Sequence, residues 1–310
     1  MKLLITGANG MLGQALRKFA KYSNFEVLTP ARLDLDLTDS AKTLKYFKEA
    51  EPDAVIHAAA RVGGITANIE NPLQFLTENL QIDNSVLGAS RITKVPNLIY
   101  ISSSCMYPKN LEKPMRESDL LTGSLESTNE AFALAKIVGT KTVQITSEVE
   151  SLNWKTFVFS NLYGPYDHFE SSRSHVLGAI IEKVCEAKKL DLDYVEMWGD
   201  GTARREFTYV DDVAKFMISK ISNLRSIPSL LNISSGQDLS IRDYYELVMD
   251  LVEFRGQLQI NLNKPTGMKR KLMDTSLASK NGWVSTTSLQ DGLKETINWY
   301  QEYSMEGARK

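Results

Sequence analysis

The sequence contains only two cysteines, Cys105 and Cys185, which lie far apart in a chain of 310 residues. Domains that depend on disulfides contain several cysteines, so a disulfide framework is not expected and a reducing compartment is favoured. The chain also lacks an apolar run long enough to span a bilayer. The segment from Met1 to Thr6 reaches Gly7 too early for a secretory signal. These absences predict a cytoplasmic protein without a membrane partner.

The chain has little net charge, because 36 Lys and Arg residues stand against 38 Asp and Glu residues. Binding to nucleic acid or to an anionic membrane usually requires a basic excess, so neither partner is expected. An anionic ligand must instead be held locally, by helix N-termini and by individual Arg or Lys side chains. With 43% hydrophobic and 24% charged residues, the composition is that of an ordinary globular protein, long enough for two domains.

A glycine-rich turn follows the first apolar run. Residues Lys2 to Thr6 are typical of a buried parallel strand, and apolar residues return at helical spacing between positions 16 and 20. Gly7 would permit the tight turn, Gly10 would let the backbone approach a pyrophosphate, and Gly13 would let the helix pack on the strand. The N–H groups of the helix N-terminus would then face the phosphates. This pattern predicts a dinucleotide site, with a plain strand-to-helix turn as the alternative.

Arg32 follows the second predicted strand, Glu26 to Leu28, and the first carboxylate after that strand, Asp34, comes later. An acidic residue at the end of this strand usually holds the ribose 2′-hydroxyl of NAD, whereas Arg suits a 2′-phosphate. The order of these residues therefore favours NADP. The alternative is a solvated Arg on a surface loop.

Two further apolar runs, at 53–60 and 97–101, predict buried strands that end in small or polar residues. The alanines from Ala58 to Ala60 would leave room for a flat ligand at the sheet crevice. His57 is interpreted as a structural or cofactor-flanking residue rather than a catalyst. The segment from Ser102 to Pro108 places hydroxyls and a thiol where α/β sheets bind ligands, and ordinary loop capping is the alternative.

The alternation of strands and helices predicts an α/β fold, a doubly wound parallel sheet of the Rossmann type with a smaller C-terminal α/β substrate-binding domain. The alternation ends at Gly164 and Pro165. We predict that the dinucleotide-binding domain comprises residues 1–165 plus about 206–235, and the substrate domain about 166–205 plus 236–310. Within 198–207, two adjacent arginines predict either a diphosphate clamp or a charged hairpin.

One helix, predicted from Asn129 toward Val149, carries Phe132 and Lys136 one turn apart on the same face. A Tyr in place of Phe132 would form an acid/base pair with Lys136, because the ammonium lowers the pKa of a phenol. Phe132 has no proton to give. The helix therefore belongs to a working enzyme, to a disabled one, or to a binding protein without catalysis.

These motifs, in order along nearly the whole chain, resemble one family. The arrangements Thr6-Gly7-x-x-Gly10-x-x-Gly13 and Ser103 with Lys136 resemble the extended short-chain dehydrogenases/reductases. Within that group the chain resembles the GDP-L-fucose synthases, which are GDP-4-keto-6-deoxymannose epimerase-reductases. The matching segments are Val62-Gly63-Gly64-Ile65, Ser103-Ser104-Cys105-Met106-Tyr107-Pro108, Asn161-Leu162-Tyr163-Gly164-Pro165, Ser174-His175-Val176, Trp198-Gly199-x-Gly201, Arg205-Glu206-Phe207 and Arg270-Lys271-Leu272.

The resemblance implies catalytic roles at five positions. Ser103 would hydrogen-bond the C4 oxygen of the sugar. Lys136 would bind the nicotinamide ribose hydroxyls and support the phenol that Phe132 replaces. Cys105 and His175 would be the base and the acid for epimerisation, because a proton on the carbon beside a ketone is acidic enough for a thiolate to remove.

The resemblance also implies what the chain binds: NADP(H) as the cofactor, a GDP-4-keto-6-deoxy sugar as the substrate, and no metal. The expected cofactor contacts are Gly7, Asn9, Gly10, Met11, Leu12, Gly13, Arg32, Ala58, Ala59, Ala60, Lys136, Asn161, Leu162 and His175. The expected substrate contacts are Lys183, Trp198, Arg205 and Lys271. The family further implies a homodimer in which the helix carrying Lys136 packs against its symmetry mate.

The chain departs from the family pattern at two positions. Thr266 stands where the family usually has an Asp that contacts substrate, so the sugar could be a hexose or a heptose. Phe132 stands where the family has its catalytic Tyr, and losing a positioned general acid costs about 10²–10⁴-fold in rate. Because the rest of the site matches, we interpret Phe132 as a deliberate Tyr→Phe replacement rather than a natural loss of function.

Three functions are compatible with the sequence. The leading hypothesis is NADPH-dependent reduction at C4, with or without epimerisation at C3 and C5, in GDP-L-fucose-type nucleotide-sugar biosynthesis, impaired here by Phe132. The second is a nucleotide-sugar 4-epimerase of the same fold, although such chemistry does not need Cys105 and His175. The third is a catalytically silent NADP-binding protein in which Phe132 is natural. The intact Ser103 and Lys136 argue against this third function.

Overall fold

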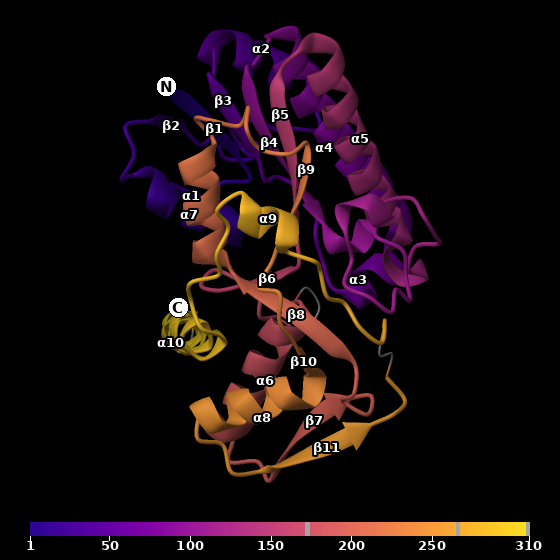
Figure 1. Cartoon of the computed structure of the whole chain (residues 1–310). Helices are drawn as coiled ribbons and strands as arrows, with labels where there is room; N and C mark the ends of the chain where they lie inside the picture. Colours follow the sequence, from indigo (N-terminus) through magenta and orange to yellow (C-terminus); the bar gives the residue numbers. More distant parts are fainter. Residues whose placement is uncertain (171–173, 265–266, 308–310) are drawn as a thin grey trace.

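The computed structural model describes residues 1–170, 174–264 and 267–307, and it has two lobes (Figure 1). The larger lobe contains a six-stranded sheet with the strand order β2-β1-β3-β4-β5-β9. Its strands are β1 (Lys2–Thr6), β2 (Glu26–Leu28), β3 (Ala54–His57), β4 (Asn97–Ser103), β5 (Asn153–Phe159) and β9 (Leu230–Ile233). All neighbouring strands run parallel. The strand order reverses between β1 and β3, which is where folds of this kind bind their ligands.

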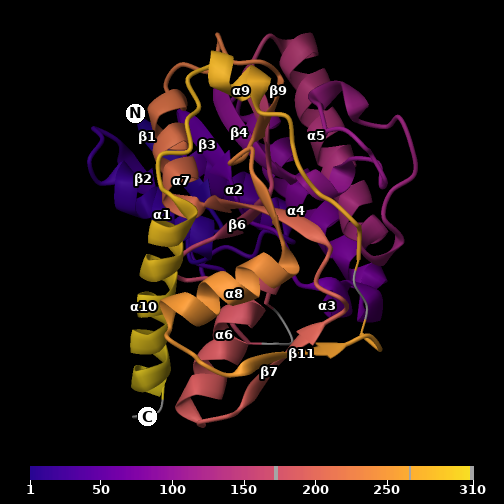
Figure 2. The same cartoon turned by 60° about the horizontal axis from the view of Figure 1, so that its bottom comes forward.

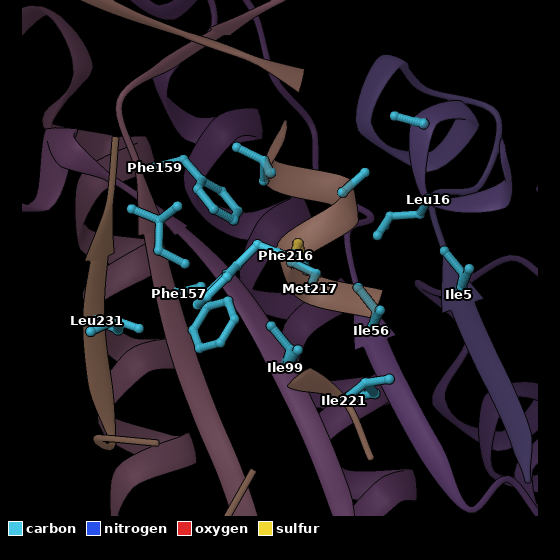
Figure 3. Close-up of a cluster of buried hydrophobic side chains, with 14 of the residues drawn as sticks. Ile5, Leu16, Ile56, Ile99, Phe157, Phe159, Phe216, Met217, Ile221 and Leu231 are labelled. Atoms are coloured by element: carbon cyan, nitrogen blue, oxygen red, sulfur yellow. The ribbon is translucent and has the colours of Figure 1, made fainter. Parts of the chain in front are cut away.

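Helices cover both faces of this sheet. They are α1 (Met11–Ala20) and α7 (Val210–Lys220) on one face, and α2 (Ser40–Ala50), α4 (Pro72–Ile92) and α5 (Glu130–Glu150) on the other. Figure 3 shows the first interface, where Phe157 and Ile99 of the sheet pack against Phe216 and Met217 of α7. Such two-sided burial explains the nearly continuous apolar strands. The doubly wound parallel sheet predicted from the sequence is confirmed.

The smaller lobe contains two short sheets, with the strand orders β10-β8-β6 and β11-β7. Its strands are β6 (Asn161–Tyr163), β7 (Tyr194–Trp198), β8 (Arg204–Tyr209), β10 (Asp238–Ser240) and β11 (Gln257–Asn261). Its helices are α6 (Val176–Lys189), α8 (Ile241–Leu251) and α10 (Leu289–Gly307), and α10 lies beside α6 and α8 (Figure 2). Phe207 of β8 and Tyr244 of α8 pack edge to face in the core of this lobe.

Short helical segments connect these elements. They are α3 (Ile65–Glu70), α9 (Ser276–Lys280) and the 3₁₀ turns η1 (Ser104–Met106), η2 (Glu117–Asp119) and η3 (Ser127–Asn129). Although α9 comes late in the chain, its Ala278 belongs to the apolar cluster on the α1 and α7 face of the large sheet. Within the described residues, no helix has the length and apolar character needed to cross a bilayer.

The predicted charged hairpin at 198–207 is wrong. Strand β7 pairs with β11, whereas β8 pairs with β6 and β10, so the two strands belong to different sheets. Arg204 and Arg205 are successive residues of β8 and point to opposite faces. Arg204 is bonded to Asp238, at 3.2 Å between its Nε and a carboxylate oxygen. This arrangement argues against a clamp formed by both arginines on one ligand.

Candidate active site

The glycine turn between β1 and α1 has two glycines that the fold itself requires. Gly7 has a φ of +68°, and a Cβ there would lie 2.7 Å from the backbone N of Ala59. A Cβ at Gly13 would lie 2.2 Å from the carbonyl oxygen of Gly7. Gly10 differs, because it has a φ of −77° and the nearest protein atom to a Cβ would be 3.6 Å away. The protein alone therefore does not explain Gly10, whereas close approach of a ligand phosphate does.

The start of α1 fits an anionic ligand. Gly10 is the N-cap residue and offers no side chain to cap the first turn, so backbone N–H groups there are left for another acceptor. Asn9 is exposed, and Met11 and Leu12 are partly buried in that turn. The partly buried alanines that follow β3 lie beside the turn, because β1 and β3 pair in parallel up to Thr6 and His57. They are Ala58, Ala59 and Ala60.

Arg32 lies at the surface near this turn, with 79% of its side chain exposed. Its Nη2 atom is 3.5 Å from one carboxylate oxygen of Glu78, and Nη1 of Arg61 is 2.8 Å from the other. One carboxylate therefore brings two guanidinium groups together. Sequence reasoning identified Arg32 and missed Arg61, whose only signal was its place directly after the alanines.

Phe132 and Lys136 lie on the same face of α5, as the helical spacing predicts. The Nζ atom of Lys136 is 6.0 Å from the centroid of the Phe132 ring, and the ring packs edge to face against Phe75 at 6.4 Å. Lys136 is only 3% exposed. Ser103 ends β4, and its Oγ accepts a hydrogen bond from the backbone N–H of Cys105 at 3.5 Å. The parallel sheet thus delivers Ser103 and Cys105 to the carboxyl edge where ligands bind.

Cys105 lies in η1 and is 6% exposed. Burial raises the pKa of its thiol, and the positive charge of Lys271 and the hydrogen bond with Ser103 oppose that rise. Burial also lowers the pKa of the Lys271 ammonium, and the electrostatic interaction with Cys105 opposes this by raising it. Sequence reasoning assigned Lys271 to the substrate. The structure places its charge beside the candidate base.

His175 occupies the N-cap position of α6 with extended backbone geometry, and its side chain makes no capping hydrogen bond. Burial lowers the pKa of its imidazole, and the charge of Lys271 lowers it further. A lowered pKa makes the protonated form scarcer at neutral pH but also more acidic. A Cβ at Gly64 would lie 2.7 Å from the carbonyl oxygen of Ser174, so the segment before α3 contacts the segment before α6. Candidate residues from both lobes therefore meet here.

The remaining predicted cofactor contacts lie on β6. The side-chain amide of Asn161 donates to the backbone oxygen of Glu206 at 3.3 Å. Leu162 is partly buried against the apolar cluster of the large sheet. Strand β6 follows β5 directly and pairs with β8 of the smaller lobe, so it leads from one lobe to the other.

Trp198 forms an aromatic surface on the smaller lobe, 38% exposed at the end of β7. The Nζ atom of Lys183 lies 4.8 Å from its ring centroid, and that of Lys264 lies 5.0 Å from it. Its indole N–H donates to a carboxylate oxygen of Glu196 at 2.8 Å. Sequence reasoning found Trp198 and Lys183 but not Lys264. The predicted departure at Thr266 lies outside the described residues.

Arg205 contacts the loop that follows β11. Its Nη1 donates to the backbone oxygen of Arg204 at 2.8 Å, and burial lowers the pKa of its guanidinium. A Cβ at Gly267 would lie 3.2 Å from Nη2 of Arg205 and 3.3 Å from Cδ1 of Ile65. Two matching segments, those that contain Ile65 and Arg205, therefore converge with Gly267 of the loop after β11, although all three are distant in sequence. Among the described residues, no cluster of His, Cys, Asp and Glu could hold a metal ion.

Comparison with known proteins agrees with this geometry. Residues 3–234 match the model of the NAD dependent epimerase/dehydratase family. The chain is 43% identical over 299 residues to a GDP-L-fucose synthase of Azorhizobium caulinodans, covering 96% of each chain. It is 40% identical over 301 residues to a GDP-L-colitose synthase of Yersinia pseudotuberculosis, covering 97% of this chain and 98% of that one.

Among solved structures, the chain is similar to a GDP-mannoheptose C4 reductase from Campylobacter jejuni with NADP bound, with a TM-score of 0.86 and 32% identity. That similarity covers 97% of this chain and 98% of the other. Sequence and structure therefore agree over nearly the whole length. The chain belongs to the NAD dependent epimerase/dehydratase family and, within it, to the GDP-L-fucose synthase family.

Proposed function

We propose that the chain reduces the C4 ketone of a GDP-4-keto-6-deoxy sugar and that its cofactor is NADPH. The relatives named above are a GDP-L-fucose synthase, a GDP-L-colitose synthase and a C4 reductase with NADP bound. The observation that carries the proposal is the buried Lys136 ammonium, one helical turn from position 132. A buried charge is costly and is usually retained for a function.

The chain's own residues bind and orient the two ligands. The Gly7 to Gly13 turn and the start of α1 would hold the pyrophosphate, Arg32 the 2′-phosphate and Lys136 the ribose hydroxyls. NADPH, when bound, supplies the hydride. Ser103 would hold the C4 oxygen of the sugar. Hydride addition leaves an alkoxide on that oxygen, and the alkoxide must receive a proton.

Phe132 cannot give that proton. Losing a positioned general acid costs about 10²–10⁴-fold in rate, so we expect this chain to be impaired and a Tyr at position 132 to restore it. This expectation rests on our interpretation of Phe132 as a replacement within an otherwise complete site.

Epimerisation beside the ketone is supported by a second set of residues. Cys105 would remove a proton from the carbon next to C4, and His175 would return one on the other face. The charge of Lys271 opposes the rise in the Cys105 pKa that burial causes, which favours the reactive thiolate. Cys105, His175 and Lys271 would thus serve epimerisation, while Ser103 and position 132 serve reduction.

The two domains would divide the ligands. Residues 1–165 plus about 206–235 would hold NADP, and about 166–205 plus 236–310 would hold the nucleotide sugar, although β6 and β8 pair and pack within the smaller lobe. In the second domain, Trp198 offers a ring on which the base of the nucleotide sugar would stack. The ammonium groups of Lys183 and Lys264 lie at this ring and would attract the phosphates.

A homodimer through α5 would bury an exposed apolar stripe. Its members are Leu134, Val138, Ile145 and Val149, which are 41%, 50%, 60% and 76% exposed. A hollow of about 360 Å³ lies beside this stripe, between α4 and α5. A stripe along one helix can pair with its own copy across a two-fold axis. Replacing Val138 and Ile145 by Lys should convert the dimer to a monomer in light scattering, and a monomeric starting protein would contradict the proposal.

The function is tested by comparing the chain with Phe132→Tyr in an NADPH oxidation assay with GDP-4-keto-6-deoxy hexoses and heptoses. We expect a rate gain of about 10²-fold or more from the restored donor. Phe19→Tyr is a matched control, because Phe19 also lies beside ammonium groups, those of Lys18 and Lys215 at 5.3 and 5.1 Å, but far from Lys136.

Two results would contradict the proposal. Equal inactivity of both proteins with every sugar, while NADPH still binds, would favour a binding protein. Conversion of the sugar without net oxidation of NADPH would favour a 4-epimerase.

A further inference from the structure

A buried carboxylate outside the predicted site lies next to Lys136. Asp83 of α4 is 3% exposed, and its Oδ1 atom is 3.8 Å from the Nζ atom of Lys136. The ammonium also lies 4.6 Å from the ring centroid of Tyr100. A buried Lys without a counter-charge tends to lose its proton, and a buried Asp tends to gain one. Each of these groups therefore needs the other.

Asp83 is also the acceptor at the end of a chain of hydrogen bonds. Nε2 of His57 lies 3.1 Å from its Oδ1, and the hydroxyl of Tyr100 donates to its Oδ2 at 2.5 Å. Oγ of Thr6 lies 2.7 Å from Nδ1 of His57, and the backbone N–H of Ala59 donates to that Oγ at 3.3 Å. If the imidazole proton is on Nε2, every donor in this series of hydrogen bonds has one acceptor.

The charges support this direction of the hydrogen bonds. Burial lowers the pKa of His57, which favours its neutral form. Burial by itself would raise the pKa of Asp83, but the Lys136 ammonium and the hydrogen bonds from His57 and Tyr100 outweigh it and hold that pKa below its usual value. The network therefore contains one negative charge and one positive charge, both inside the protein.

The packing of α5 allows this contact. A Cβ at Gly139 would lie 2.2 Å from the hydroxyl of Tyr100 and 3.0 Å from Oδ2 of Asp83. Glycine at this position lets α5 approach β4 and α4 closely enough for Lys136 to reach the carboxylate. The position of the ammonium is thus determined by four elements: α4, α5, β3 and β4.

We infer that Asp83 is a positioning residue: it holds the Lys136 ammonium in place and links it, through His57 and Thr6, to the backbone N–H of Ala59 beside the glycine turn. The inference rests on the proposed function, in which Lys136 binds the nicotinamide ribose and supports the proton donor. Asp83 itself touches neither ligand in this account. It acts through Lys136.

Asp83→Asn is the test, because the amide keeps the shape and an acceptor for His57 but removes the charge. In the Phe132→Tyr background we expect kcat to fall about 10²-fold, the usual cost of a misplaced catalytic group, with little change in KM for the sugar. In the chain with Phe132 we expect the dissociation constant of NADPH to rise about tenfold, as for a lost bond to a charged group.

Asp212→Asn is the matched control. Asp212 is also 3% exposed, but it accepts hydrogen bonds from Thr286 and Thr287 and lies on α7. This variant should lose stability and keep its kcat and NADPH affinity. If Asp83→Asn behaves in the same way, Asp83 is merely structural and the inference is overturned.

Two further measurements test the role of Asp83. If Asp83→Asn does not fold, Tyr100→Phe removes one hydrogen bond to the carboxylate and should lower kcat about tenfold, while an unchanged kcat would overturn the inference. If Phe132→Tyr is itself inactive, the proposed function fails separately. The inference is then decided by NADPH affinity in Asp83→Asn, Lys136→Met and the double variant: non-additive losses uphold it, and additive losses overturn it.

Discussion

The Nζ atom of Lys136 lies 6.0 Å from the centroid of the Phe132 ring, on the same face of α5. The ammonium is buried, and Asp83 is its close ionic partner at 3.8 Å. A phenol at position 132 would therefore ionise in the presence of a fixed positive charge.

In Phe132→Tyr, the new phenol should have a pKa below its ordinary value of about 10, because the Lys136 ammonium favours the phenolate. A difference titration by ultraviolet absorbance against the chain with Phe132 isolates this one group. Adding Lys136→Met should return the pKa to its ordinary value or above. A phenol that titrates identically with and without Lys136 would show that the ammonium does not act on position 132.

The same substitution at Gly10 and Gly13 should affect folding differently. Gly13→Ala places a Cβ 2.2 Å from the oxygen of Gly7, so we expect a loss of stability of a few kcal/mol in urea denaturation. The Cβ of Gly10→Ala meets no protein atom closer than 3.6 Å, so this variant should fold normally and bind NADPH at least tenfold more weakly. Normal NADPH affinity in Gly10→Ala would show that this turn does not bind the pyrophosphate.

Solvent deuterium should enter the sugar beside C4 more rapidly as the pH rises. Burial raises the pKa of Cys105, so the thiolate fraction increases into the alkaline range. Lys271→Met removes a charge that lowers this pKa and should move the exchange profile to higher pH. Lys269→Met is the control, because Lys269 is exposed. Cys105→Ser should abolish exchange, and exchange that persists in it would exclude Cys105 as the base.

Arg32→Ala should weaken NADPH binding about tenfold or more and leave NADH binding unchanged, because only NADPH carries the 2′-phosphate. Stability should change by less than about 1 kcal/mol, since the pair with Glu78 is exposed. Arg91→Ala is a suitable control, because Arg91 forms an exposed pair with Glu150 elsewhere. An equal loss of affinity for NADPH and NADH would mean that Arg32 contacts a part of the cofactor that both share.

Local patterns in the sequence were sufficient to predict the large sheet and much of the candidate site. Gly13 is required by atoms of the turn itself and Gly7 by its positive φ, so the spacing of these glycines indicates the turn directly. Phe132 and Lys136 share a helix face, which depends only on helical periodicity. The N-cap at Ser240 is equally local, because the N–H of Asp243, three residues on, donates to its hydroxyl at 3.1 Å.

Contacts between distant segments could not be predicted in this way. The interpretation of 198–207 as a hairpin failed because β7 and β8 pair with strands from other parts of the chain. Asp83 is buried in α4, and a buried Asp needs a partner. Nothing in the spacing of residues identifies Lys136, His57 and Tyr100 as its partners, because that depends on how α4, α5 and the sheet pack.

The most direct test of the central claim follows the hydride itself. Phe132→Tyr would be incubated with NADPH deuterated at the transferable position of the nicotinamide and with the GDP-4-keto sugar, and the product examined by NMR. We predict deuterium at C4 of the product, one atom for each NADPH oxidised, with little product from the chain that retains Phe132. Deuterium at another carbon, or a product without deuterium, would contradict the assignment of this protein as a C4 reductase.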